Sequence, residues 1–342
     1  MSFNYITEIP SADEIKKLLP FPADLVEIKS KRDREIRDIF ERKNDKFFMV
    51  IGPCSADNED AVCEYISRLA VLQEAVSERV ILIPRIYTNK PRTTGEGYKG
   101  MVHQPDPNKE PNMAEGIKAI RRMHIRSFRE TYLAAADEML YPNNLPYIED
   151  LLSYIAVGAR SVENQQHRLA ISGIEVPVGM KNPTSGDTSV MFNSIYAGQR
   201  SHVFIYNRWE VCTSGNPLTH AILRGAVDLY GRSIPNYHYE NLMTVAETYL
   251  EREVENPVIV VDTNHSNSNK QFAEQPRIGM EIMQSRRNSK LLRDVVRGLM
   301  VESYLVEGSQ KVYDGVHGKS ITDPCLGWDA TEDFVKRVAD AV

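Results

Sequence analysis

From Phe47 onward the sequence alternates short apolar runs with segments of helical periodicity, and this alternation restricts the possible folds most strongly. Strands that are apolar along their whole length must be covered on both faces, and helices that connect parallel strands provide that cover. The apolar runs lie at residues 47–52, 80–84, 132–136, 155–159, 176–180, 202–206, 258–261 and 298–301. Eight such strands with helices between them predict a (β/α)8 TIM barrel, an α/β fold.

The expected helices lie between most of these strands. They occupy residues 59–75, 114–130, 145–153, 163–172, 187–198, 240–252 and 270–287, and a last helix at 330–341 closes the chain. Between the sixth and seventh strands, residues 209–213 and 219–223 flank the segment Ser214-Gly215-Asn216-Pro217. Glycine, asparagine and proline favour tight turns, so this region predicts an inserted β-hairpin.

The first 45 residues are polar and charged, and no domain-sized core fits within them. Ser11 and Glu14 have the spacing of a helix capping box. A charge-rich segment at 29–46 predicts an exposed amphipathic helix. We therefore expect an N-terminal helical extension, residues 1–45, that packs on the main body or on a neighbouring subunit, followed by a catalytic barrel domain, residues 46–342.

The composition argues against several classes of protein. A formal net charge of -6 makes a nucleic-acid-binding surface unfavourable, so anionic small molecules must be attracted by local clusters of cations. No apolar run approaches the length of about 18 residues that a membrane span needs, and the N-terminus lacks the basic and apolar regions of a signal peptide. The four cysteines (Cys54, Cys63, Cys212 and Cys325) show no C-x-x-C spacing, which predicts a reduced, cytoplasmic protein.

Clustered cations follow the second apolar run. Arg85, Lys90 and Arg92 fall within eight residues, Pro91 fixes the backbone between the last two, and Thr93 adds a hydroxyl. Guanidinium groups pair bidentately with phosphate or carboxylate, so this segment suits an oxyanion. A solvated basic loop has the same composition, and only the residues at the other strand ends separate the two interpretations.

Charged and metal-binding residue types recur at the ends of the other predicted strands, where a TIM barrel does its chemistry. One set provides positive charge for a small polyanion that carries both phosphate and carboxylate: Arg85, Arg160, Lys181 and Arg224. A second phosphate could be held by Lys90, Arg92 and Thr93. The other set comprises thiol, imidazole and carboxylate ligands of a divalent transition metal: Cys54, His265, Glu302 and Asp323.

Each metal-type residue also has an ordinary structural interpretation. Cys54 can be a core cysteine, and His265 can cap the turn that follows it. Asp323 can be a helix N-cap, and Glu302 can pair with a cation. The spacing of the four has no compact metal signature, so their convergence on one face of the barrel supports the metal site more than any single residue does.

Eight short segments combine into a pattern that points to one family. They are I-G-P-C-S at 51–55, K-P-R-T-T at 90–94, G-A-R at 158–160, P-V-G-M-K-N at 177–182, L-R-G at 223–225, H-S-N-S-N-K-Q at 265–271, V-E-S at 301–303 and S-I-T-D at 320–323. In order and interval, from about residue 13 to the end, the chain resembles the class I, microbial type of 3-deoxy-D-arabino-heptulosonate 7-phosphate (DAHP) synthase. The resemblance implies a TIM barrel with an N-terminal extension. It also implies condensation of phosphoenolpyruvate with erythrose 4-phosphate, the first step of the shikimate pathway of aromatic amino acid and chorismate biosynthesis.

The resemblance also implies a role for each candidate residue. Phosphoenolpyruvate would be held by Arg85, Arg160, Lys181 and Arg224, and the aldose phosphate by Lys90, Arg92 and Thr93. One divalent transition metal ion (Mn, Fe, Co or Zn) would polarise the aldehyde and would be bound by Cys54, His265, Glu302 and Asp323. Glu138, after the third strand, matches the family's active-site carboxylate, and Lys181 could transfer a proton. These roles make the catalytic set Lys181, Glu138, His265 and Cys54.

Three alternative functions stay open. A 3-deoxy-D-manno-octulosonate 8-phosphate synthase shares the barrel and the phosphoenolpyruvate chemistry, but such enzymes typically have A-N-R in place of Lys90-Pro91-Arg92 and lack the long hairpin segment. A Schiff-base aldolase would use Lys181 on the same fold, and borohydride would trap its imine. A non-catalytic phosphate-ligand-binding protein would lack a metal ligand or an anion-binding cation, and none is missing from this sequence.

Assembly and regulation follow from the same features. The extension and the hairpin predict a homo-oligomer, a dimer or a tetramer. Many members of the family that the chain resembles are inhibited by an aromatic amino acid, in a pocket near the start of strand five and the loop after strand three. Here that loop reads Asn143-Asn144-Leu145-Pro146, and Glu175 precedes strand five. An acidic side chain there would repel an amino acid's carboxylate, so we expect weak or absent inhibition by phenylalanine and tyrosine and leave tryptophan or another effector open. The alternative is that Glu175 points to solvent and takes no part in such a pocket.

Overall fold

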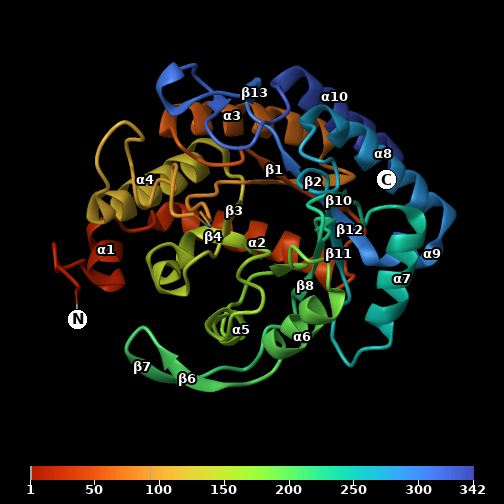
Figure 1. Ribbon diagram of the computed structural model, residues 1–342, viewed down its shortest axis with the longest axis horizontal. Coiled ribbons are helices and arrows are strands. Elements are labelled where there is room, and N and C mark those ends of the chain that lie inside the picture. The colour runs from red at the N-terminus through yellow and green to blue at the C-terminus, as the bar shows by residue number, and fades with distance from the viewer. Residues whose placement is uncertain (1, 93) are drawn as a thin grey trace.

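A sheet of eight parallel strands forms the centre of the computed structural model, which describes residues 2–92 and 94–342 (Figure 1). The strands are β1 (Phe47–Gly52), β2 (Val80–Pro84), β3 (Ala135–Glu138), β4 (Leu152–Val157), β5 (Val178–Lys181), β8 (Thr219–Leu223), β11 (Ile259–Asp262) and β12 (Val296–Glu302). Nearly all their residues are buried, as parallel strands under helices must be. The predicted (β/α)8 TIM barrel is confirmed.

The barrel closes between β2 and β3, the two ends of the strand order β2-β1-β12-β11-β8-β5-β4-β3. The other neighbours are joined by parallel ladders, such as the one between β1 and β12. The closing seam is instead an isolated bridge between Arg85 and Ala136, together with a hydrogen bond of 2.8 Å from the Ile86 N–H to the Ala136 carbonyl. This seam is therefore short, and the residues just beyond it depend on side chains for their alignment.

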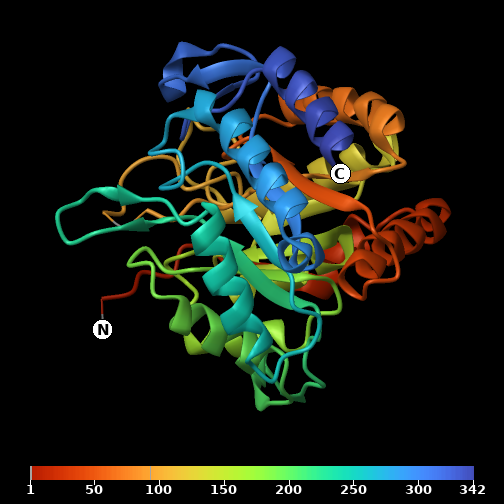
Figure 2. The ribbon, with the colours of Figure 1, turned by 90° about the vertical axis from the view of Figure 1, so that its right-hand side faces the viewer.

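Helices cover the outside of the barrel, as Figures 1 and 2 show. They are α3 (Glu59–Val76), α4 (Met113–Thr131), α5 (Gln165–Ile171), α6 (Thr188–Gly198), α7 (Tyr239–Leu250), α8 (Gln275–Asn288), α9 (Lys290–Val295) and α10 (Trp328–Ala341), with the turn η4 (Phe272–Glu274) before α8. Asparagine side chains accept hydrogen bonds from first-turn N–H groups where α3 and α4 begin, which fixes both starts. Most of the predicted helices are therefore confirmed.

The helix predicted at 145–153 is wrong. Its residues fall in two short 3-10 turns, η2 (Pro142–Tyr147) and η3 (Glu149–Leu151), and in the start of β4. Pro146 lacks a backbone N–H, so the segment cannot continue as a regular helix. The third strand also begins later than predicted, because Tyr132 ends α4 in a left-handed conformation with a φ of 55°.

The sixth barrel strand is β8, so the prediction that residues 202–206 form it is wrong. Residues 203–206 form β6 (Val203–Tyr206), which pairs antiparallel with β7 (Trp209–Cys212) in a ribbon outside the barrel. The predicted pairing of 209–213 with 219–223 is therefore wrong as well, and this hairpin precedes the sixth barrel strand. Alternate residues of β6 are exposed, with Val203 at 67% and Ile205 at 82%, whereas β8 is buried throughout.

A different hairpin lies between the sixth and seventh barrel strands. It consists of β9 (Ala226–Val227) and β10 (Ser233–Ile234), which pair antiparallel. Figure 2 shows this hairpin projecting from the end of the barrel opposite α2. A hairpin between the sixth and seventh barrel strands was therefore predicted correctly, but residues 226–234 form it and not residues 209–223.

The N-terminal extension packs on the barrel. Helix α1 (Ala12–Leu18) starts at the predicted capping box of Ser11 and Glu14, and the turn η1 (Ala23–Leu25) leads into α2 (Val26–Phe40). The prediction of an exposed helix here holds for only one of its faces. Ile36, Ile39 and Phe40 are buried and pack with side chains of the barrel interior, so α2 covers the N-terminal end of the barrel. No helix in the described part of the chain is long and apolar enough to cross a membrane.

The segment after β12 returns over the C-terminal end of the barrel. It contains β13 (Val306–Ser309), the turn η5 (Val312–Asp314) and β14 (Lys319–Ser320). Strands β13 and β14 pair with each other, and a bridge between Ser303 and Leu326 ties the returning chain to the end of β12. This path carries Asp323 back beside the strand ends.

Candidate active site

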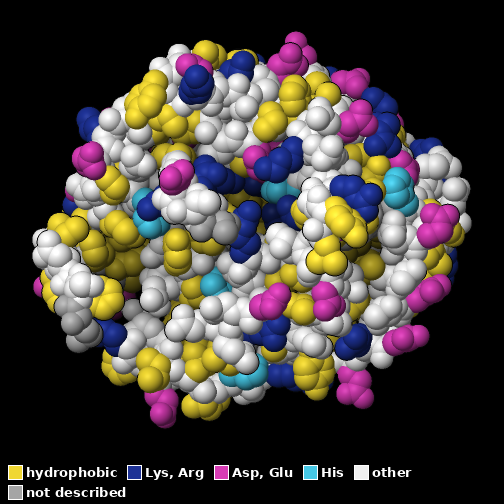
Figure 3. Space-filling model, in the orientation of Figure 1, with side chains coloured by type: hydrophobic (Ala, Val, Ile, Leu, Met, Phe, Trp, Pro, Cys, Tyr) yellow, Lys and Arg dark blue, Asp and Glu magenta, His cyan; other side chains and the backbone are white. Residues whose placement is uncertain are grey.

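The predicted site residues lie at the C-terminal ends of the barrel strands. Glu138, Lys181 and Glu302 are the last residues of β3, β5 and β12, and Arg85 and Arg224 directly follow β2 and β8. Parallel strands bring these ends to one mouth of the barrel. Figure 3 shows lysine and arginine side chains gathered around a hollow near the centre of one face. The structure therefore brings together residues that lie far apart in the sequence.

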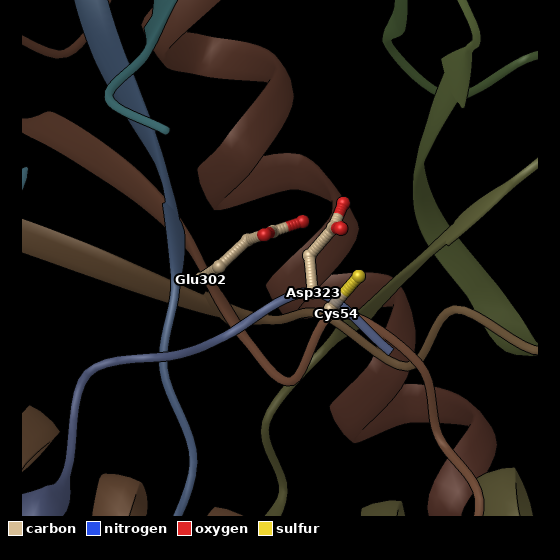
Figure 4. A group of neighbouring side chains, drawn as sticks. All are labelled: Cys54, Glu302 and Asp323. Atoms are coloured by element: carbon tan, nitrogen blue, oxygen red, sulfur yellow. The ribbon is translucent and has the colours of Figure 1, made fainter. Parts of the chain in front are cut away.

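Three of the four predicted metal ligands form one cluster. Donor atoms of Cys54, Glu302 and Asp323 all lie within 4.8 Å of one another (Figure 4). The fourth residue, His265, has its Nε2 atom 3.8 Å from Oε1 of Glu302. A thiol, an imidazole and two carboxylates around one point suit a divalent transition ion, so these residues fit the metal that the sequence implies.

The backbone around His265 is specialised. Its φ is 50°, in the left-handed region that few residues other than glycine adopt. The turn is fixed by Asn267, whose amide donates to the carbonyl groups of Leu223 and Asp262, and by the Lys270 N–H, which donates to the His265 carbonyl. These bonds hold the imidazole at the mouth in spite of the unfavourable backbone conformation.

Glu302 is ionised although it is fully buried. Arg85 donates from Nη2 to Glu302 Oε1 at 2.8 Å, and Asn264 donates to the other carboxylate oxygen at 2.6 Å. Burial alone would raise the pKa of Glu302, but the charges of Arg85 and His265 outweigh it and lower the pKa. An ionised carboxylate is the form that ligates a metal.

Lys90 lies against a metal ligand. Its Nζ donates to the Cys54 carbonyl at 2.7 Å and is 3.0 Å from the Cys54 sulfur. Burial and the Glu302 carboxylate raise the pKa of the Cys54 thiol, while the Lys90 ammonium acts in the opposite direction. Lys90 therefore belongs spatially to the metal cluster as well as to the loop that carries Arg92.

Asp262 is a site residue that sequence reasoning missed. Its Oδ2 atom lies 3.4 Å from Lys181 Nζ and 2.9 Å from His265 Nδ1, and it is fully buried. Burial would raise the pKa of Asp262, but the charges of His265 and Lys181 hold it well below its usual value. One carboxylate thus connects the candidate metal ligand with the candidate proton carrier. Its place at the end of an apolar strand is the only signal in the sequence that could have identified it.

Two buried arginines face the mouth. The guanidinium of Arg85 lies 3.8 Å from the centre of the Tyr87 ring. Within residues 2–92 and 94–342, its buried Nη1 atom has no hydrogen-bond partner. Arg224 is 9% exposed, its Nη1 reaches Ser266 Oγ at 3.4 Å, and burial lowers its pKa. Buried guanidinium groups with spare donors are suited to an anionic ligand.

The other predicted anion-binding residues lie nearer the rim. Arg160 is exposed in the loop after β4. Arg92 is half-buried and donates from Nε to the Tyr98 carbonyl at 2.8 Å. Thr93, assigned with Lys90 and Arg92 to the second phosphate, lies outside the described residues.

Glu138 is positioned by a close approach to Gly158. The Glu138 side chain is 8% exposed. A Cβ atom added to Gly158 would lie 2.5 Å from Glu138 Oε1, and the three atoms nearest to it all belong to the Glu138 carboxyl group. The glycine therefore makes the room in which this carboxylate lies.

A second cavity lies away from the mouth, near the N-terminal extension. Its volume is about 830 Å³, and it lies between α2, the start of β5 and the inner face of the β6–β7 hairpin. Its walls carry four carboxylates, from Asp33, Glu149, Asp150 and Glu175, and the ammonium of Lys29, which pairs with Asp33 at 2.7 Å. Leu145 and Glu175, taken from the sequence as part of a regulatory pocket, both line it.

Comparisons with known proteins identify the family and agree with the fold. The family model described as the DAHP synthetase I family matches residues 24–336. The Phe-sensitive phospho-2-dehydro-3-deoxyheptonate aldolase of Escherichia coli (strain K12) is 34% identical over 356 residues, covering 99% of this chain and 98% of the relative. The Trp-sensitive enzyme of the same strain is 35% identical over 317 residues, covering 90% and 88%. A solved structure of phospho-2-dehydro-3-deoxyheptonate aldolase from Francisella tularensis SCHU S4 superimposes with a TM-score of 0.91 at 28% identity, over 100% of this chain and 98% of the other.

Proposed function

The chain belongs to the DAHP synthetase I family, and on that premise we propose that it condenses phosphoenolpyruvate with erythrose 4-phosphate. The products are 3-deoxy-D-arabino-heptulosonate 7-phosphate and inorganic phosphate, in the first step of aromatic biosynthesis. The observation that carries the proposal is the meeting, at one mouth of the barrel, of a transition-metal donor set with the buried cations Arg85, Lys181 and Arg224.

The metal-dependent family chemistry requires a metal site, which we assign to Cys54, His265, Glu302 and Asp323. A bound Mn, Fe, Co or Zn ion would supply Lewis-acid polarisation of the aldehyde oxygen. Lys90 and Arg85 flank the same cluster, and their charges balance the ionised ligands. The protein thus provides a largely pre-organised group of donors rather than one assembled by binding.

Phosphoenolpyruvate would be held by the cations around the mouth. Arg85, Lys181 and Arg224 are almost fully buried, and ion pairs in a site with little water are stronger than at the surface. The Nη1 donor of Arg85, which has no partner among the described residues, gives a phosphate or carboxylate oxygen a place to bind. Arg160, on the rim, would complete the neutralisation when substrate binds.

The aldose phosphate would be held by Lys90, Arg92 and Thr93. The Nε bond to the Tyr98 carbonyl fixes the Arg92 guanidinium in place. Lys90 belongs to the same loop as Arg92, and its Nζ bonds the Cys54 carbonyl. It would therefore lie between the phosphate of the aldose and the aldehyde near the metal ligands. This arrangement orients the aldehyde toward the enol carbon of the other substrate.

Charge that develops during carbon–carbon bond formation would be stabilised by charged side chains at the mouth. As C3 of phosphoenolpyruvate attacks the aldehyde carbon, positive charge grows at C2, and the Glu138 carboxylate is the group that would stabilise it. Lys181 would donate a proton from Nζ to the aldehyde oxygen as that oxygen becomes a hydroxyl, and the Asp262 carboxylate would hold the ammonium in place. Water then adds at C2 and gives up its protons, and cleavage of the bond between C2 and the phosphate oxygen leaves a ketone at C2 and inorganic phosphate.

A direct assay separates this function from its alternatives. An eight-carbon octulosonate requires a five-carbon aldose phosphate, whereas a seven-carbon heptulosonate requires a four-carbon one. We expect phosphate release from phosphoenolpyruvate with erythrose 4-phosphate and little release with a five-carbon aldose phosphate. Preference for the five-carbon substrate would support the octulosonate synthase, and a borohydride-trapped adduct on Lys181 would support a Schiff-base aldolase. If neither aldose phosphate led to phosphate release, the result would support the non-catalytic binding protein.

We also propose a homo-oligomer. The outer face of the β6–β7 hairpin exposes Val203 and Ile205, Trp209 is exposed beside the hairpin turn, and the first residues expose Tyr5 and Ile6. Exposed apolar side chains gathered on projecting segments are typical of subunit contacts. Light scattering on the purified protein should give a multiple of 38.9 kDa, and Ile205→Asp combined with Trp209→Asp should reduce it toward that value.

A further inference from the structure

We propose that Asp137 is a positioning residue, which aligns the Lys90 loop with Glu138 across the closing seam of the barrel. The proposal extends the function proposed above, because its kinetic consequence depends on the roles of Lys90 and Glu138. Its structural consequence, the alignment of two segments, does not depend on those roles.

The carboxylate of Asp137 accepts three hydrogen bonds, two from Thr88 across the seam and one from the next residue of its own strand. Its Oδ1 atom accepts from the Thr88 N–H at 2.9 Å and from the Glu138 N–H at 2.6 Å. Its Oδ2 atom accepts from the Thr88 hydroxyl. Asp137 is 1% exposed, so these bonds are shielded from competing water.

The bonds between Thr88 and Asp137 lie at the β2–β3 seam, where few backbone bonds join the barrel. The β2–β3 seam is the one closed by the isolated bridge between Arg85 and Ala136 and by the Ile86 N–H. Directly beyond that bridge, the bonds from Thr88 to Asp137 continue the connection with side-chain atoms where a ladder would use backbone atoms. Without them, the described residues of the loop after β2 would be joined to β3 by the Arg85–Ala136 bridge and the Ile86 N–H bond alone.

Both sides of this seam carry groups that the reaction uses. Thr88 lies two residues before Lys90, whose Nζ bonds the Cys54 carbonyl. Glu138 directly follows Asp137, and its own N–H is one of the three donors. The Asp137 carboxylate therefore sets the distance between a substrate-binding lysine and the active-site carboxylate.

Helix α4 places a buried histidine near the carboxylate without a hydrogen bond to it. His124 of this helix is 2% exposed, and its Nε2 atom lies 3.9 Å from Asp137 Oδ2. In the part of the chain that the structure describes, neither ring nitrogen of His124 has a hydrogen-bond partner. A buried carboxylate is costly unless it is bonded, and the bonds from Thr88 and Glu138 offset the burial of Asp137.

The kinetic test compares graded variants at the two ends of the contact. Asp137→Ala removes all three bonds and should lower kcat by tenfold or more, since a displacement near 1 Å at a reacting group can cost about a hundredfold. Its effect on the KM for phosphoenolpyruvate should be small, because Arg85 and Arg224 keep their own contacts. Thr88→Val, which keeps the N–H bond and loses the hydroxyl, should be intermediate. Thr88→Ser keeps both bonds and should restore a nearly normal kcat.

A matched control separates positioning from general destabilisation. Asp150 pairs bidentately with the buried Arg121 at the other end of the barrel, with two contacts of 2.7 Å. Asp150→Asn should lower the melting temperature and leave kcat unchanged. Equal loss of kcat in Asp150→Asn and Asp137→Ala would overturn the proposal, as would wild-type kinetics in Asp137→Ala.

Hydrogen exchange tests the seam independently of catalysis. Asp137→Ala should speed amide exchange in segments 86–92 and 136–139, and Asp150→Asn should leave these segments protected. Unchanged exchange there in Asp137→Ala would contradict the alignment. If the wild-type protein forms no heptulosonate product, the proposed function fails, and the exchange measurement still decides the structural part of the inference.

Discussion

Replacing Gly158 with alanine should impair catalysis without weakening the fold. The new methyl group would lie 2.5 Å from Glu138 Oε1, whereas ordinary contact begins at 3.4 Å, so the carboxylate must move by about 0.9 Å. The atoms in the way are the tip of a flexible side chain, and the glycine backbone is outside the left-handed region. The protein can therefore accept the methyl group, but only by displacing Glu138.

A displacement near 1 Å at a reacting group can cost up to about a hundredfold in rate, so we expect kcat to fall between about tenfold and a hundredfold. Stability should be unchanged or slightly higher, because alanine restricts the unfolded chain and is worth about 0.4–1 kcal/mol at a compatible site. Steady-state kinetics and thermal unfolding of the same preparation measure both effects.

A double-mutant cycle identifies the cause. In a Glu138→Ala background the methyl group has no carboxylate to displace, so adding Gly158→Ala should change kcat by less than about twofold. A wild-type kcat in Gly158→Ala would refute the assigned role of Glu138. The same loss of kcat in both backgrounds would show that the methyl group acts elsewhere.

Three further predictions concern the substrates, acid stability and regulation. Arg92→Ala should mainly raise the KM for erythrose 4-phosphate, while Lys181→Ala should also lower kcat; an effect of Arg92→Ala on phosphoenolpyruvate alone would refute the second phosphate site. Burial lowers the pKa of His220 to about 3 from 6.5, so the unfolded chain binds the extra proton. The contribution of neutral His220 to the free energy of unfolding is complete above about pH 6.5 and should be lost at up to about 1.4 kcal/mol per pH unit as the pH falls toward 3. Denaturant titrations over this pH range should show that the free energy of unfolding depends less on acid in His220→Gln than in the wild type. Inhibition by phenylalanine or tyrosine should be weak, because the Glu175 carboxylate lines the second cavity and would repel the carboxylate of an amino acid, and Glu175→Gln should strengthen it; strong inhibition of the wild type over a millimolar range would contradict this.

The barrel could be predicted because its strands are buried on both faces and therefore apolar along their length. The sixth strand could not be predicted in this way, because it begins with the polar residues Thr219 and His220. Burial of His220 depends on tertiary contacts, such as the hydrogen bond of 2.8 Å between its ring and the Tyr154 hydroxyl. Residues 203–206 are as apolar as a barrel strand, but they pair with β7 outside the barrel. Composition does not distinguish a strand buried on two faces from one buried on a single face.

The candidate site was predictable where a residue type has an unusual position, and unpredictable where the function depends on a contact. Cations and metal-type ligands directly after apolar runs identify the mouth, as with Arg85 and Glu302. Asp137 lies inside β3, and its importance follows only from the groups that folding brings to it. Asp262 ends β11, which is a weak signal in the sequence, but its contacts with Lys181 and His265 exist only in the folded chain. The contact between Lys90 and Cys54 joins two loops in the same way.

Metal dependence combined with Cys54→Ala tests the central claim most directly. Treatment with a chelator should abolish formation of the heptulosonate phosphate, and a divalent transition ion should restore it in the wild-type protein. Cys54→Ala should remain folded, bind the ion more weakly and regain little activity, because one of four donors is lost. Full activity in thoroughly metal-free protein, or in Cys54→Ala, would contradict the assignment of this mouth as a metal-dependent active site.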